Sequence, residues 1–254
     1  MQRSLSRFGR RPDAVLQHLI ALQQAFSFVP DQAIGLLVDA LEVTRAQVLA
    51  AIDFYAFLHL LPRGAYDILF SDNITDRMLG NQALFKSLCK KLGVEPGVPR
   101  EDGKVTVSLT SCTGICDQGP AMLVNGLVVS NLTEKRIHKM VGRIEAGIPV
   151  SEWPKSLFVV KDNIRRKDKL LTDDIINGSA IGALAAMGGE VTLKRLEESG
   201  LRGRGGAGFG SGLKWRLCRE TDAEEHYVVC NADEGEPGTF KDRVLLNSYA
   251  YYLF

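Results

Sequence analysis

The chain has 254 residues, of which 45% are hydrophobic and 24% are charged, and its net charge is +1. This length is enough for two domains, and the composition is ordinary for a soluble globular protein. The small net charge argues against nucleic acid or an anionic membrane as the main partner. No apolar run is long enough to span a membrane, and no signal peptide is recognisable. The five cysteines do not follow a disulfide framework, which predicts reduced thiols and a cytoplasmic location.

The N-terminal part of the chain is predicted to be helical. Val15, Leu19 and Leu22 recur with a helical period. A turn follows, after which Asp31 and Thr44 can cap two further helices. The pattern therefore predicts three helices before the first strand.

The next part of the chain predicts an α/β unit in the order strand, helix, strand, hairpin and helix. We expect these elements at residues 65–70, 76–93, 104–111, 121–132 and 132–147. Asn125 and Gly126 are typical of a two-residue hairpin turn. Thr133 can cap the last helix, and Gly93 can end the first one.

The pattern of elements predicts a four-part chain of the α/β class. The parts are a helical bundle at 1–61, an α/β domain at 62–147, a charged linker at 148–177 and the start of a second α/β domain at 178–254. In the last part, residues 191–199 predict a helix that ends at Gly200. An apolar strand is expected at 226–230.

A glycine-rich stretch, GLRGRGGAGFGSGLKW, spans residues 200–215. Glycine lets another molecule approach the backbone N–H groups closely, and consecutive N–H groups before a helix attract an anion. Arg204 and Lys214 add positive charge, so we expect the loop to bind a phosphate. The G-x-G-x-x-G spacing would fit a nicotinamide dehydrogenase of the Rossmann type only if a strand came before it. The segment before this loop is predicted to be helical instead.

Polar side chains follow the predicted strand at 226–230. They are Asn231, Asp233, Glu234 and Glu236. Carboxylates at a strand end repel one another and need partners, for which ribityl and ribose hydroxyls or a base amide are suitable. The alternative is a simple acidic turn closed by a proline and a glycine.

Together, RGRGGAGFGSGLKW and VVCNADEGEPGTFKDR resemble the NADH-binding flavoprotein subunit of respiratory complex I. They are also similar to the diaphorase subunit of soluble NAD-reducing hydrogenases and of NAD-linked formate dehydrogenases. The resemblance covers residues 160–254 and implies a Rossmann-like domain that binds FMN and NAD. It implies that FMN is bound by Gly203, Arg204, Gly205, Gly206, Lys214, Asn231, Asp233 and Glu234. It further implies that Phe209 stacks on the nicotinamide and Glu236 contacts NADH, while the flavin itself transfers the hydride.

The resemblance is incomplete at the C-terminal end. The later glycine- and glutamate-rich flavin motif and the four-cysteine cluster site of that family are missing. The chain ends on an apolar aromatic stretch, NSYAYYLF, without a cap or polar tail. We therefore expect a C-terminally truncated chain, in which the flavin pocket is not complete.

A second resemblance rests on SCTGICDQGPAMLVNG, in which Cys112 and Cys116 follow a predicted strand. Two thiolates are half of a [2Fe–2S] site. With the leading helices, residues 12–147 resemble the thioredoxin-like [2Fe–2S] subunit that partners the complex I flavoprotein. That family has two more cysteines after its first strand, where this chain has Ser71 and Asp76.

Because clusters favour thiolate ligands, the sequence argues against an intact [2Fe–2S] cluster in the N-terminal domain. Three alternatives stay open at this point. They are an intact cluster, a fold that has lost its cluster and serves for docking, and a redox pair of Cys112 and Cys116.

The fusion of both units in one chain resembles the hydrogenase diaphorase subunit. The resemblance implies an NAD-linked flavin oxidoreductase that passes electrons between NAD(H), FMN and iron–sulfur clusters. An iron–sulfur electron-transfer subunit and hydrogenase subunits are the implied partners, and NADH is the implied substrate. The alternatives are a cluster-free assembly subunit of an NADH-oxidising complex, and a flavoprotein subunit of complex I or formate dehydrogenase.

Overall fold

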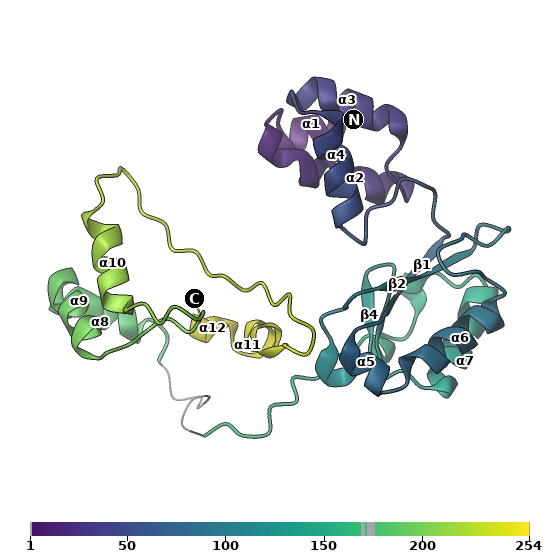
Figure 1. The fold of residues 1–254 in the computed structure, drawn as a ribbon. Helices are drawn as coiled ribbons and strands as arrows, with labels where there is room; N and C mark the ends of the chain where they lie inside the picture. Colours follow the sequence, from purple (N-terminus) through teal and green to yellow (C-terminus); the bar gives the residue numbers. More distant parts are fainter. Residues whose placement is uncertain (1, 169–170, 172–175, 254) are drawn as a thin grey trace. The chain divides into compact units, whose positions relative to one another are not determined.

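The computed structural model describes residues 2–168, 171 and 176–253 (Figure 1). Contacts between Cα atoms divide the chain into two units. The first unit extends to Lys161 and includes the returning segment Glu234–Phe240, while the second contains Asp162–Asp233 and the residues from Lys241 onward. The division into four parts stays a prediction. Residues 169–170 and 172–175 of the predicted linker lie outside the described residues.

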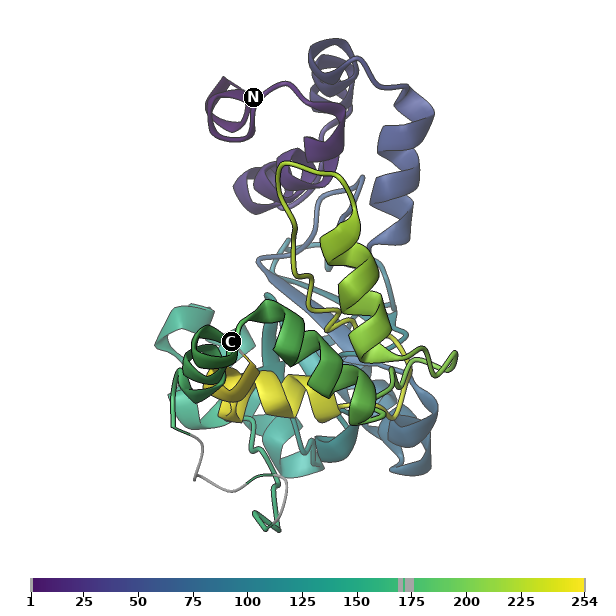
Figure 2. The same ribbon diagram turned by 90° about the vertical axis from the view of Figure 1, so that its left-hand side faces the viewer.

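The first unit begins with a bundle of helices, which confirms the predicted helical period. The helices are α1 (Gln2–Phe8), α2 (Val15–Phe26), α3 (Asp31–Leu41) and α4 (Arg45–Phe54), with a 3-10 turn at Pro12–Ala14. Figure 2 shows these helices, in purple to blue, gathered together. Leu19, Ile34, Leu37 and Val48 are fully buried between them. Thr44 caps α4 as predicted, in a reciprocal capping box with Gln47. The sequence did not predict α1.

A four-stranded mixed sheet follows, with the strand order β2-β1-β3-β4. The strands are β1 (Tyr66–Ser71), β2 (Val105–Thr110), β3 (Met122–Val124) and β4 (Leu127–Val129). Strand β1 pairs in parallel with β2 and antiparallel with β3. The predicted hairpin turn is confirmed, because Asn125 and Gly126 both have positive φ angles, of 49° and 80°.

Three helices accompany the sheet: α5 (Ile74–Met78), α6 (Asn81–Leu92) and α7 (Glu134–Glu145). Helices α6 and α7 contact each other, and their apolar side chains share one core with the sheet residues Ile68 and Phe70 (Figure 1). Two successive inward positions of β1 have the same orientation, so both helices cover one face of the sheet. As predicted, Thr133 caps α7 by accepting a hydrogen bond from a backbone N–H of its first turn.

The single helix predicted at 76–93 is wrong, since the chain forms two helices there. Gly80 lies between α5 and α6 with a φ of 80°, in the left-handed region that interrupts a helix. The next residue, Asn81, is buried and donates a hydrogen bond to the Ser71 carbonyl at 2.7 Å. The predicted helix end at Gly93 is confirmed, with a φ of 63°.

The core of the first unit continues past α7 through two 3-10 turns, Val150–Glu152 and Lys155–Leu157. Between them, Trp153 is buried and stacks with Tyr66 of β1 and with Phe158. The start of the predicted linker is therefore packed against the sheet.

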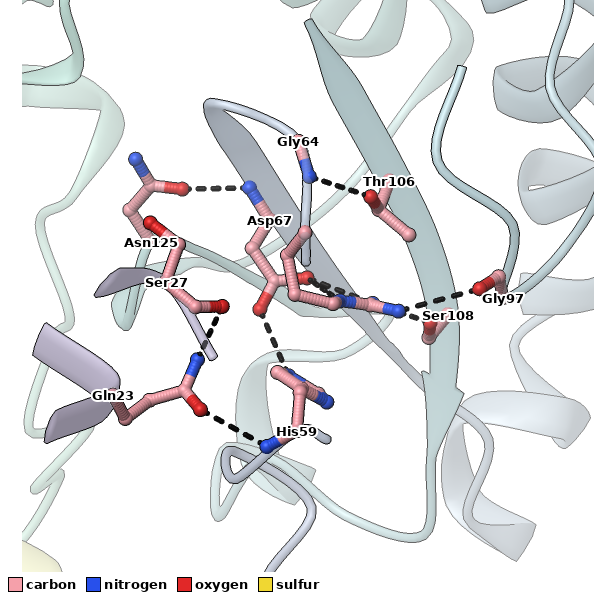
Figure 3. Close-up of polar contacts among 10 residues, drawn as sticks. Gln23, Ser27, His59, Gly64, Asp67, Gly97, Thr106, Ser108 and Asn125 are labelled. Carbon is pink, nitrogen blue, oxygen red and sulfur yellow. Dashed lines mark hydrogen bonds and ion pairs between the residues drawn. The ribbon is translucent and has the colours of Figure 1, made fainter. Parts of the chain in front are cut away.

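A group of polar side chains connects the helical bundle to the sheet (Figure 3). Asp67 of β1 accepts hydrogen bonds from His59 Nε2 at 3.2 Å and from Arg63 Nε at 2.9 Å. Arg63 also donates to Ser108 of β2, and the His59 N–H donates to Gln23 of α2. Burial alone would raise the pKa of Asp67, but the hydrogen bonds and charges of His59 and Arg63 outweigh it and hold that pKa below its usual value.

The second unit is helical in its described residues. Its helices are α8 (Ser179–Met187), α9 (Gly189–Glu198), α10 (Ser211–Glu220), α11 (Lys241–Ser248) and α12 (Ala250–Leu253). The strand predicted at 226–230 is wrong: this segment has no regular structure, and Val228 is 97% exposed. A strand needs the hydrogen bonds of a neighbouring strand, and the described part of this unit offers only one isolated bridge, between Arg202 and Gly210.

A search of the described helices for a membrane span finds none of sufficient length and apolar character.

Replacing Asp67 by Asn removes the negative charge that faces His59 and Arg63. Because the Arg63 side chain is only 8% exposed, we expect the free energy of unfolding to fall by about 1–3 kcal/mol at pH 7. The folded pKa of Asp67 is lowered, so its stabilising effect is complete above its unfolded pKa of about 3.9 and is lost as the pH falls through the folded value. Urea unfolding at pH 7 and at more acidic pH measures both effects.

The matched control is Asp53→Asn, on the exposed side of α4. This change should alter the free energy of unfolding by less than about 0.5 kcal/mol. Equal stability of Asp67→Asn and the unchanged protein at pH 7 would show that the connection to the bundle does not depend on this ion pair.

Candidate functional site

Two loops meet at one edge of the sheet, and four side chains with ligating atoms lie on them. Because β1 and β2 are parallel, their carboxyl ends lie at the same edge, with Ser71 paired to Thr110. The end of β1 and the loop after it carry Ser71 and Asp76, and the loop after β2 carries Cys112 and Cys116. The structure therefore brings together the positions that the sequence resemblance implied.

The side chain of Asn73 lies at the centre of this group. Its Nδ2 donates to Ser71 Oγ and to Asp76 Oδ2, both at 3.0 Å. The same nitrogen lies 3.6 Å from the Sγ atoms of Cys112 and Cys116. Four ligating atoms thus converge on one amide nitrogen.

Asn73 was missed at the sequence level, although a signal for it exists. It is the N-cap of α5, and its Oδ1 accepts hydrogen bonds from the Asp76 N–H at 2.8 Å and from Thr75 Oγ1 at 2.6 Å. An Asn three residues before an acidic residue is a familiar pattern at the start of a helix. The cap fixes Asn73 and Asp76 with respect to each other.

Asp76 is a buried carboxylate without a cation beside it among the described residues. It is 1% exposed, and its Oδ1 has no hydrogen-bond partner in the part of the chain that the structure describes. Burial raises the pKa of Asp76, and the hydrogen bonds from Ser71 and Asn73 offset this only in part. The backbone of Gly119 passes so close to Asp76 that a side chain there would collide with the carboxylate.

The two thiols of the site lie side by side but are not bonded. Cys112 Sγ and Cys116 Sγ are 3.5 Å apart, whereas a disulfide bond is about 2.05 Å long. Two thiolates that bind one metal tetrahedrally at about 2.3 Å lie about 3.7 Å apart, which is close to the observed separation. Burial raises the pKa of the Cys112 thiol.

The glycine-rich loop of the second unit closes on itself. Gly203 N donates to the Phe209 carbonyl at 2.9 Å, and Arg202 donates to the Gly208 carbonyl at 3.2 Å. Gly206 and Gly208 have φ angles of 106° and 61°, which side chains other than glycine rarely adopt. The stretch of backbone between these contacts is exposed.

This loop leaves its amides available to an anion. Within the described residues, the N–H groups of Arg204, Gly205 and Gly206 donate no hydrogen bond. Helix α10 begins directly after the loop, at Ser211, so that its N-terminal dipole adds to the attraction. Lys214 lies in the first turn of α10, and Phe209 is about half exposed at the end of the loop.

The element before the loop is helix α9, which ends at Glu198. The Rossmann fingerprint requires a strand there, so the G-x-G-x-x-G spacing does not indicate a dinucleotide-binding half of that type. Helices α9 and α10 pack tightly at Gly212, where an added Cβ would lie 2.6 Å from the Glu197 nitrogen. Arg216 of α10 forms ion pairs with Glu190 and Glu197 of α9.

The acidic residues predicted for the flavin lie on an irregular, mostly exposed segment. Asn231 Oδ1 accepts a hydrogen bond from the Asp233 N–H at 3.1 Å, so this side chain stabilises its own turn. Glu234 and Glu236 belong to the segment that is grouped with the first unit, where Gly238 approaches Thr75 of α5. The assignment of these four residues to a cofactor stays a prediction.

Residues 1–145 match the family described as thioredoxin-like [2Fe-2S] ferredoxin. The chain belongs to this family. A shorter stretch, residues 196–253, matches the family described as the Nuo51 FMN-binding domain. The chain is also 31% identical over 130 residues to one of the proteins of the Escherichia coli NADH-quinone oxidoreductase, covering 51% of this chain and 78% of that protein.

Two further relatives extend over both units. NAD-reducing hydrogenase HoxS subunit alpha of Cupriavidus necator is 32% identical over 254 residues, which is 95% of this chain and 42% of that protein. The crystal structure of an NAD⁺-reducing [NiFe]-hydrogenase in the air-oxidized state contains a similar chain, with a TM-score of 0.82 and 39% identity. The similarity covers 94% of this chain and 42% of that one. The chain thus spans less than half the length of these two relatives.

Family membership overturns the expectation that the N-terminal domain carries no [2Fe–2S] cluster. That expectation gave too much weight to the missing cysteines, at Ser71 and Asp76. Among the described residues, no three His, Cys, Asp or Glu side chains stand ready to hold a metal ion. The donor set nevertheless fits an iron centre, because two thiolates at chelating distance face a hydroxyl and a carboxylate with an oxygen unpartnered in the described chain.

Replacing Gly212 by Ala tests the packing that supports the glycine-rich loop. The new Cβ would collide with the Glu197 backbone, so we expect α9 and α10 to separate at a cost of about 1–3 kcal/mol. Hydrogen exchange of the α10 amides would then become faster, and mass spectrometry of deuterium uptake measures it.

The control for this change is Gly182→Ala in α8, where nothing lies within 4 Å of the added Cβ. Alanine favours a helix over glycine by up to about 1 kcal/mol, so this variant should be as stable as the unchanged protein or slightly more stable. The close packing of α9 and α10 would be refuted by equal exchange rates in both variants.

Proposed function

We propose that this chain is the N-terminal portion of a diaphorase subunit. Such a subunit passes electrons between NAD(H), FMN and iron–sulfur clusters, and we infer that a hydrogenase module is its redox partner. The observation that carries the proposal is the joining of both units in one chain, a ferredoxin-type fold followed by a glycine-rich loop before a helix. A relative named as an NAD-reducing hydrogenase subunit has the same order over 95% of this chain.

The flavin phosphate is assigned to the glycine-rich loop. The N–H groups of Arg204, Gly205 and Gly206, which donate to no described residue, and the dipole of α10 favour a bound dianion. The cations of Arg204 and Lys214 offset its charge. Gly203 holds the loop closed through its bond to the Phe209 carbonyl. When bound, FMN supplies the chemistry that converts a hydride into single electrons.

The remaining residues are assigned to positioning. Phe209 exposes its ring and is suited to stack on a nicotinamide. Asn231, Asp233 and Glu234 are proposed to bind FMN through its hydroxyl groups, and Glu236 to contact NADH. No side chain of the chain is proposed to exchange the hydride.

We assign the [2Fe–2S] centre to the edge of the sheet where β1 and β2 end, with Cys112 and Cys116 as thiolate ligands. Their separation of 3.5 Å suits two ligands of one iron. An iron–sulfur electron-transfer subunit and hydrogenase subunits are the proposed partners. The described cysteines are all free thiols, which supports a cytoplasmic location.

A second candidate is the flavoprotein subunit of complex I or of a formate dehydrogenase. The identity to proteins of NADH-quinone oxidoreductases favours it, because these relatives match each unit separately. The Rossmann-type dehydrogenase is not a candidate, since α9 stands where its strand would be.

The decisive experiment is anaerobic purification of the complete protein that contains this chain, with flavin analysis and an NADH–dye reductase assay. We expect about one FMN per protein and NADH-dependent dye reduction. Purification with the hydrogenase subunits would separate the first candidate from the second. A flavin-free protein without dye reduction would refute both.

Replacing both Arg204 and Lys214 by Ala should weaken FMN binding about 10- to 100-fold, because two charge-assisted contacts to the phosphate are lost. Riboflavin lacks the phosphate, so its affinity should not change. Quenching of flavin fluorescence during titration of the flavin-depleted protein measures both affinities.

The control variant carries Lys194→Ala and Arg195→Ala, which remove the same charge from α9. It should bind FMN as the unchanged protein does. An equal loss in both double variants would mean that net charge, and not the glycine-rich loop, attracts the phosphate.

A further inference from the structure

We propose that Ser71 and Asp76 are iron ligands, so that the cluster of this chain has two sulfur and two oxygen side-chain ligands. Cys112 and Cys116 then bind one iron, and Ser71 and Asp76 bind the other. The proposal rests on the family's cluster and on the geometry of the first unit, and it is independent of the diaphorase function proposed above.

The first argument is convergence. Ser71 Oγ and Asp76 Oδ2 lie 3.0 Å from Asn73 Nδ2, and both cysteine sulfurs lie 3.6 Å from it. Side chains from two loops that are far apart in the sequence therefore surround one small volume. The amide now occupies the point where the ligands meet, so binding of the cluster displaces it.

The second argument is the cost of burying Asp76. A buried carboxylate without a cation, and with one oxygen lacking any partner among the described residues, is expensive to maintain. A metal ion would compensate both the charge and the unpartnered oxygen. Asp67, in the same sheet, has two cations beside it and its pKa shifts the other way. The difference marks Asp76 as the carboxylate with an unmet need.

The third argument is the separation of the two pairs. Cys112 and Cys116 lie on one loop, and their sulfurs are 3.5 Å apart, as for two ligands of a single iron. Ser71 and Asp76 lie together at the end of β1 and the start of α5. The chain thus offers one sulfur pair and one oxygen pair to a cluster with two irons.

This arrangement makes the two irons chemically different. Thiolates are soft ligands that give strong charge-transfer absorption, whereas hydroxyl and carboxylate oxygens are hard ligands that do not. The oxidised centre should therefore have two unlike ferric sites and weaker visible absorption than a centre with four thiolates.

The test uses the full chain reconstituted anaerobically with ⁵⁷Fe and sulfide. For the unchanged chain we expect two irons, and two different quadrupole doublets in the Mössbauer spectrum. The Ser71→Cys/Asp76→Cys variant should retain two irons, show a single type of doublet and absorb more strongly in the visible. The Asp76→Ala and Ser71→Ala variants should each lose iron at least several-fold.

The control is Asp72→Ala, which removes a neighbouring carboxylate that pairs with Arg77 at the surface. It should keep the iron content and both doublets, and circular dichroism verifies the fold of every variant. Identical doublets in the unchanged chain and the double cysteine variant would overturn the proposal, as would a chain that binds no iron. Flavin content and NADH–dye reductase activity of the complete protein are independent of these outcomes, so failure here leaves the diaphorase function intact.

Discussion

The parallel pairing of β1 with β2 is the constraint on which the candidate cluster site depends. Parallel strands end at one edge of a sheet, so the register that pairs Ser71 with Thr110 also brings the two loops together. The helices α6 and α7 hold this pair of strands from one face. An antiparallel pairing would send Cys112 to the opposite edge, where no ligating side chain of the β1 loop could reach it.

Strand β1 has different electrostatic surroundings at its two ends. Near its start, Asp67 faces His59 and Arg63, and the carboxylate holds the helical bundle against the sheet. Beyond its end, Asp76 is buried with hydrogen-bond donors but without a cation among the described residues. Two carboxylates of one small fold thus have pKa shifts of opposite sign, which separates a structural role from a functional one.

Much of the first unit could be predicted because its signals are local. A residue pair such as Asn125 and Gly126 specifies a turn, and Thr133 specifies a helix start, without knowledge of distant contacts. The break at Gly80 escaped prediction because glycine within a helical pattern is compatible with either one helix or two. The central place of Asn73 could not be predicted, since it depends on two loops that meet only in the folded chain.

Long-range pairing explains what the sequence predicted wrongly in the second unit. The apolar segment from Tyr227 to Cys230 has the composition of a buried strand, yet Tyr227 and Val229 are both largely exposed. Backbone and side chains of this segment are therefore open to any sheet edge they meet. In concentrated preparations of this chain, such a stretch would recruit copies of itself into intermolecular β-structure, so self-association and precipitation would be governed by these few residues.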